Sequence, residues 1–247
     1  MKHRQWLFMF ALSLILLSAL LFGIHYFIFQ DLHHILIYTI HDIAFLPIEV
    51  LLVTIVIHSL LERQNLQQKL EKLNMVIGTF YSGIGTQLLK LFVRYDLHIA
   101  DMREDLLIST SWNSVTFKNQ KKKAREFSYI VDVNNMNLKE LRDLLLDHED
   151  FLLRILENPV MLEHESFTDV LRAVFHLNEE LKNRDDLTSL PEVDLMHLRG
   201  DMKRAYSLMT LSWLDYMNYL KGDYPYLYSL AIRLNPFSLN EDVYIRE

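Results

Sequence analysis

The sequence predicts an all-α protein, in which a transmembrane helical hairpin is followed by a cytoplasmic helical bundle. Two long apolar runs near the start of the chain, Trp6 to Phe29 and Ile35 to Leu61, predict the hairpin. The 247 residues include only six glycines and five prolines. No stretch alternates apolar and polar residues as a half-buried strand would, so helices are expected throughout.

Each apolar run is long enough to cross a bilayer, because about 20 apolar residues in a helix span the hydrocarbon core. Only Gln30 to His34 separates the runs, which predicts a tight antiparallel hairpin over residues 1–61. The first run is too long for a signal peptide. Basic residues lie at both far ends of the hairpin: Lys2, Arg4, Arg63, Lys69 and Lys72. The positive-inside rule then places both termini in the cytoplasm and the protein in the cell membrane.

Two acidic residues, Asp42 and Glu49, interrupt the second apolar run. A carboxylate at the centre of a membrane helix costs about 2.5–3.5 kcal/mol even on lenient scales, so it indicates a functional site. The two acids are seven residues apart and lie on one side of the helix. In a homo-oligomer they would form rings around an axis, as in many cation pores. Alternatively, they are polar contacts within the hairpin, where the candidate partners are Ser13, Ser18, Tyr38 and Thr39.

Other residues of the hairpin extend this hypothesis. Pro47 lacks the N–H that would bond the carbonyl of Ile43, and the freed oxygen is a candidate ion ligand, although an ordinary membrane-helix kink is the simpler interpretation. Arg63 follows the same helical side and is a candidate gate. It opposes cation flow unless it is paired, for which Glu62 of a neighbour is the candidate. Imidazoles and carboxylates gather at the outer end as candidate modulators or metal ligands, namely His25, Asp31, His33, His34 and His41.

The second membrane helix is expected to continue through residues 62–95 as a coiled-coil-like helix. Apolar residues follow at alternating spacings of four and three, namely Leu66, Leu70, Leu73, Ile77, Phe80 and Ile84. This spacing is typical of a seam between helices of different subunits. The alternative is a linker helix that packs on its own domain, with a break near Gly78.

The cytoplasmic bundle is predicted over residues 96–234. The expected helices span residues 96–110, 116–131, 138–157, 164–184, 190–221 and 225–234. Asn137 and Ser189 are the expected N-caps of two of them, and Gly222 is expected to close the longest helix. Residues 235–247 are expected to form a tail.

The remaining features exclude several classes of function. The net charge of -7 argues against nucleic-acid binding, and the absence of cysteine excludes disulfides and thiolate metal sites. No phosphate loop or catalytic motif is present, so neither an enzyme nor a cofactor is expected. His176, Glu180, Asp194 and His197 have metal-binding side chains, but a di-iron bundle needs two Glu-x-x-His pairs, so we expect no catalytic centre there.

Three segments, residues 42–54, 71–78 and 162–167, resemble a group of uncharacterised prokaryotic membrane proteins with two membrane helices. The resemblance covers most of the chain. It implies a prokaryotic cytoplasmic membrane, and it implies no activity and no functional residues.

Together these features predict a homo-oligomeric channel that passes cations along the acids of the second helix. Its expected partners are the lipid bilayer, cations and further copies of the chain. The alternative is a membrane-tethered scaffold or regulatory protein, whose bundle recruits an unidentified cytoplasmic partner.

Overall fold

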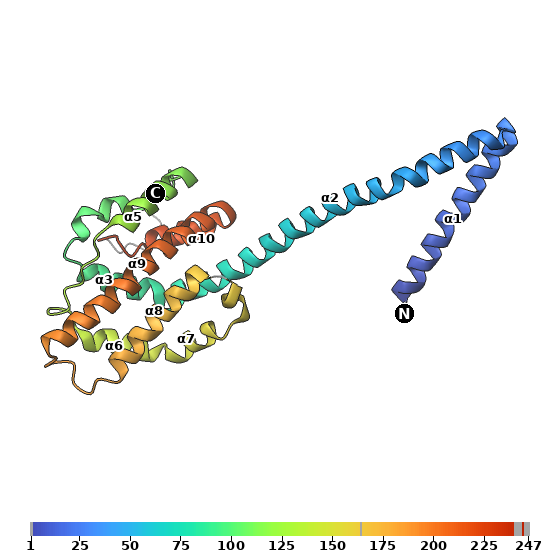
Figure 1. The fold of residues 1–247 in the computed structure, drawn as a ribbon. Helices are drawn as coiled ribbons and strands as arrows, with labels where there is room; N and C mark the ends of the chain where they lie inside the picture. The colour runs from blue at the N-terminus through green and yellow to red at the C-terminus, as the bar shows by residue number, and fades with distance from the viewer. Residues whose placement is uncertain (1, 164, 240–243, 245–247) are drawn as a thin grey trace. The chain divides into compact units, whose positions relative to one another are not determined.

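The computed structural model describes residues 2–163, 165–239 and 244 of the chain. It divides into two compact parts, residues 1–66 and 67–247, called here the hairpin unit and the bundle unit. The α-helices (Figure 1) are α1 (Lys2–Phe29), α2 (Leu32–Phe80), α3 (Thr86–Arg94), α4 (Arg103–Leu106), α5 (Ser114–Glu126), α6 (Leu138–Asp147), α7 (Glu149–Leu156), α8 (Glu165–Lys182), α9 (Glu192–Asp223) and α10 (Pro225–Arg233). A π-helical turn, Tyr81–Gly85, joins α2 to α3. Two 3₁₀ turns span Ile99–Asp101 and Pro159–Glu163.

A two-residue turn makes the hairpin between α1 and α2. Gln30 has a positive φ of 49°, and its backbone N–H donates to the carbonyl of Tyr26. The carboxylate of Asp31 then accepts a hydrogen bond from the backbone N–H of His34 at 3.0 Å. This bond satisfies one of the unpaired donors at the start of α2, as an N-cap side chain does.

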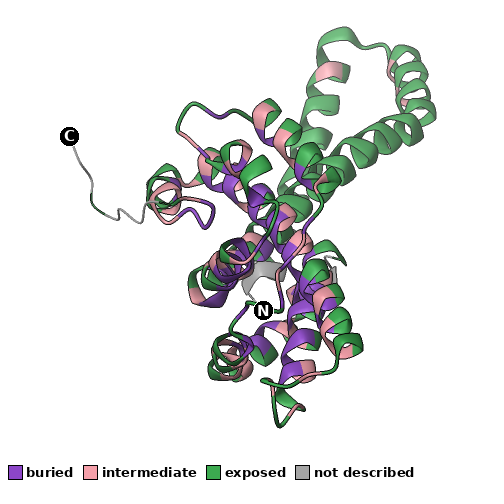
Figure 2. Ribbon diagram, turned by 90° about the vertical axis from the view of Figure 1, so that its left-hand side faces the viewer, coloured by how far each residue is buried: buried purple, intermediate pink, exposed green. Residues whose placement is uncertain are grey.

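The hairpin unit carries two segments that are long and apolar enough to cross a membrane. One is Phe8–Phe29, and the other lies within Leu32–Arg94. The most apolar window of each segment has no buried residue. Figure 2 shows both helices of the hairpin almost wholly in the colour of exposed residues. Exposed apolar surface of this extent needs another apolar environment to cover it.

The bundle unit is organised around α9, which packs against α8, α5, α10 and α3. Its side chains form the centre of a continuous apolar core, in which Met202, Tyr206 and Met209 are fully buried. Helices α6 and α7 also pack against α8. Burial of apolar surface between helices is therefore what holds this unit together.

The end of α2 belongs to this core. Leu73, Ile77 and Phe80 are buried, as is Ile84 in the π-helical turn. They pack inside their own chain, so from Leu73 onward the expected seam is not available to a second copy. The helix also does not break at Gly78; its hydrogen bonding changes three residues later, at Tyr81.

Three expected helices differ from the structure. The helix expected from 116 to 131 ends at Glu126, because Phe127 is extended. The segment expected as a helix from 96 to 110 begins with a bridge between Asp96 and Val131 and contains only short helical turns. The expected helix from 138 to 157 is interrupted at His148, where φ is −113°, so α6 and α7 are separate. Of the expected tail, residues 240–243 and 245–247 lie outside the described residues.

Candidate functional site

Asp42 lies on the face of α2 that is turned toward α1. Between the two helices the hairpin unit has an open groove of about 620 Å³. Its polar lining consists of Ser18, His25, His34, Tyr38, Thr39 and Asp42, and the rest is apolar. Six polar side chains near the turn of the hairpin therefore gather between α1 and α2, and one of them is a carboxylate.

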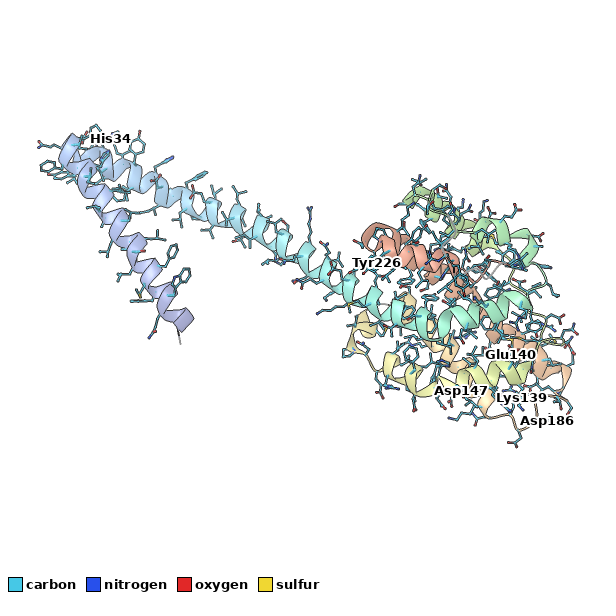
Figure 3. All side chains as sticks on the ribbon, turned by 180° about the vertical axis from the view of Figure 1, so that it is seen from behind. His34, Lys139, Glu140, Asp147, Asp186 and Tyr226 are labelled. Atoms are coloured by element: carbon cyan, nitrogen blue, oxygen red, sulfur yellow. The ribbon has the colours of Figure 1, made fainter. Side chains whose placement is uncertain are left out.

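Of the five residues predicted as modulators or metal ligands, His25 and His34 lie in this groove. The rings of His25 and His34 are stacked with centroids 6.2 Å apart, and His34 also contacts Tyr38 at 4.6 Å. Figure 3 labels His34 beside the turn of the hairpin. His33 and His41 are exposed and do not line the groove. The expected cluster is thus split, and a pair of stacked imidazoles is what remains near Asp42.

Asp31 has a structural role in the turn. The backbone N–H of His34 donates to its carboxylate and holds the pKa of Asp31 below its usual value. A carboxylate that is occupied in this way has less capacity to bind a metal ion together with the histidines.

Glu49 and Pro47 lie deeper in the apolar run. Glu49 is exposed, and among the described residues no side chain or backbone group pairs with its carboxylate. The neighbours Ile48 and Val50 are 50% and 55% exposed, so a single hairpin does not cover this position. α2 continues through Pro47 without interruption.

Arg63 is exposed and forms no ion pair with the described residues of its own chain. Glu62, its candidate partner, instead lies 3.3 Å from Nε2 of His58, one turn earlier on α2. Both of these side chains are about 70% exposed, so the pair adds little to stability.

A second cluster lies in the bundle unit, on α8 and α9. Ligand atoms of His176, Glu180 and His197 lie within 4.8 Å of one another. Asp201, which the sequence analysis missed, lies against both histidines at 3.5 and 3.2 Å. Asp194 is not part of this cluster; its carboxylate accepts two hydrogen bonds from Arg184.

The fold thus defines a class of protein, in which a helical hairpin able to cross a membrane precedes an α-helical bundle. Two family models match the chain: residues 2–61 match the N-terminal helical domain of MJ1433, and residues 69–233 match the C-terminal helical domain of the uncharacterized protein MJ1433. The chain is 43% identical over 247 residues to the uncharacterized protein MJ1433 of Methanocaldococcus jannaschii, covering 100% of this chain and 99% of that protein. The chain belongs to the MJ1433 family. No solved structure matches it.

Proposed function

We propose that the protein is a homo-oligomeric membrane channel for cations, with Glu49 at the narrow part of the pore. The observation that carries the proposal is the unpaired, exposed carboxylate of Glu49 in the middle of an apolar segment. Facing lipid, such a group costs several kcal/mol. A second copy of α2 against this side of the helix removes Glu49 from lipid and places equivalent carboxylates around a common axis.

Asp42 supplies the outer acidic position. It lies two turns from Glu49, about 10 Å along the helix axis, and an ion that leaves one carboxylate ring meets the next. His25 and His34, beside Asp42 in the groove, are positioned to modulate entry. The carbonyl that Pro47 leaves free is an additional ion ligand, and Arg63 limits flow at the inner end.

The orientation follows from the distribution of basic residues. Lysines and arginines flank both far ends of the hairpin, which favours a multi-pass protein of the cell membrane with both termini in the cytoplasm. The bundle unit then lies on the cytoplasmic side, where it is available to regulate the pore.

A membrane-tethered regulatory protein is the second candidate, and the position of Asp42 favours it. Asp42 lies in the groove beside Ser18 and Thr39, where a carboxylate also serves to join α1 to α2. In that case the hairpin is an anchor, and the bundle binds a cytoplasmic partner.

Ion flux into liposomes that contain the purified full-length chain separates these candidates. We expect cation flux from the wild type and a strong loss in Glu49→Gln and Asp42→Asn, because each removes one charge per subunit at nearly constant size. Leu51→Gln is the matched control, since it places the same amide at the same depth on the opposite side of α2. Flux that is unchanged in both acid variants contradicts the acidic pore. The absence of flux from correctly inserted wild-type protein favours the tether.

A further inference from the structure

The cluster on α8 and α9 is formed by two matched pairs of residues. His176 and Glu180 are four residues apart on α8, and His197 and Asp201 are four residues apart on α9. Residues at this spacing lie on one face of a helix, one turn apart. α8 and α9 pack against each other, and the chain between them contains Asp186, labelled in Figure 3. The packing brings the two pairs face to face.

Ligand atoms of His176, Glu180 and His197 all lie within 4.8 Å of one another, and Asp201 lies against both histidines. Nε2 of His176 lies 3.8 Å from Oε1 of Glu180 and 3.5 Å from Oδ2 of Asp201. Nε2 of His197 lies 3.5 Å from Oε2 of Glu180 and 3.2 Å from Oδ2 of Asp201. With bonds of about 2.0–2.2 Å to the metal, the ligand atoms of a tetrahedral zinc site lie about 3.3–3.6 Å apart.

The buried carboxylate of Asp201 also indicates that a cation binds here. Asp201 is 6% exposed, and its Oδ2 atom is buried without a hydrogen-bond partner. A buried acceptor with no partner costs about 1–3 kcal/mol, and more when it is charged. Oδ2 is the same atom that lies against both imidazoles. A cation between these groups satisfies it.

Arg184 holds the side chain of Glu180 in place. Its guanidinium donates to Oε2 of Glu180 at 2.8 Å and forms two hydrogen bonds with Asp194. Metal ligands are commonly oriented by such outer hydrogen bonds.

We propose that His176, Glu180, His197 and Asp201 bind a divalent transition-metal ion of the zinc class. Two neutral imidazoles and two carboxylates suit a tetrahedral ion of charge 2+, and the absence of cysteine leaves nitrogen and oxygen ligands. The histidines are exposed while Asp201 is buried, which gives the ion a path from solvent. The ion joins α8 to α9 beside their connection and stabilises the bundle unit. This site is separate from Glu49 and Asp42, so it does not depend on the proposed channel.

The test is metal binding by the full-length chain, purified in detergent without a histidine tag and first stripped with a chelator. Titration with Co²⁺ is expected to give the visible absorption of a tetrahedral complex with one ion per chain, and Zn²⁺ is expected to displace it. Zinc is also expected to raise the thermal unfolding temperature, because it binds only the folded site.

Variants assign the binding to this cluster. His197→Gln and His176→Gln change exposed side chains and are expected to fold, and each is expected to weaken Co²⁺ binding by at least about tenfold. Asp201→Asn tests the buried ligand with nearly the same shape. Glu179→Gln and His98→Gln change residues outside the cluster and are expected to bind as the wild type does. Absence of Co²⁺ binding by the wild type, or binding that both histidine variants retain, overturns the proposal, because an ordinary histidine–carboxylate network needs no metal.

Discussion

The hydroxyl of Tyr81 donates a hydrogen bond to the backbone carbonyl of Met209, 2.7 Å away. Tyr81 begins the π-helical turn at the end of α2, and Met209 lies in the middle of α9. Both side chains are buried, and Tyr81 also stacks on Tyr216 with ring centroids 5.6 Å apart. This contact fixes the last turn of α2 against the central helix of the bundle unit.

Replacing Tyr81 with phenylalanine is expected to lower the free energy of unfolding by about 1 kcal/mol, the net contribution of one hydrogen bond. The ring and its stacking on Tyr216 remain. The measurement is urea unfolding of the bundle unit in the full-length chain, followed by circular dichroism. A variant as stable as the wild type shows that this bond does not hold α2 in place.

Two glycines predict opposite effects of the same substitution. A Cβ atom at Gly85 would lie 2.6 Å from Cε1 of Phe80 and 2.8 Å from Cδ1 of Tyr81, both buried rings. Gly85→Ala is therefore expected to destabilise the protein by about 1–3 kcal/mol through overpacking.

At Gly200 in α9, an added Cβ atom would have no neighbouring atom within 4 Å. Gly200→Ala is expected to add about 0.5–1 kcal/mol, because alanine favours the helix. Thermal unfolding of both variants checks the pair, and a stabilised Gly85→Ala variant refutes the packing around the π-helical turn.

The buried carboxylate of Asp96 predicts a specific dependence of stability on pH. Burial raises its pKa above the ordinary 3.8, although the backbone N–H of His98 donates to it. A raised pKa means that the folded state holds the proton more tightly than the unfolded state does. The contribution of Asp96 to stability is therefore present below pH 3.8 and is lost as the pH rises through the raised pKa.

Asp96→Asn removes this titration. The difference in unfolding free energy between the variant and the wild type is expected to shift in favour of the variant as the pH rises from below 3.8 to neutral. Taking the difference cancels the contributions of the other carboxylates, which both proteins share. A difference that stays constant over this range means that Asp96 titrates normally.

Local patterns in the sequence predicted the all-helical fold and the hairpin correctly. They did not predict the ends of several helices. Asn137 is the N-cap of α6, as predicted; its side chain accepts from the backbone N–H of Glu140. The prediction for Ser189 is wrong, because its hydroxyl donates to Asp186 and α9 begins three residues later. The apolar pattern after Asp96 looked helical because buried turns and short helices also need apolar residues.

The apolar stripe that begins at Leu66 shows that periodicity does not identify the partner against which a helix packs. Leu66 is 58% exposed, whereas Leu73 is 5% exposed within the core of its own chain. An apolar stripe predicts that a helix packs against something, and tertiary contacts alone decide whether the partner is the same chain.

The metal-ligating cluster was only partly visible in the sequence for a similar reason. Asp194 and His197 are three residues apart, which suggested that they act together. In the structure Asp194 instead accepts hydrogen bonds from Arg184. The informative signal was two pairs spaced by four, His176 with Glu180 and His197 with Asp201. Their meeting depends on the packing of α8 against α9, which no local pattern contains.

The proposed pore lined by Glu49 is tested most directly by disulfide crosslinking in native membranes. The chain has no cysteine, so Glu49→Cys and Leu51→Cys each introduce a single thiol. The two positions point in nearly opposite directions, because two residues of a helix turn by about 200°. Mild oxidation is expected to join subunits of the Glu49→Cys variant and to leave those of Leu51→Cys monomeric. Crosslinking of Leu51→Cys alone, or of neither variant, contradicts a pore lined by Glu49.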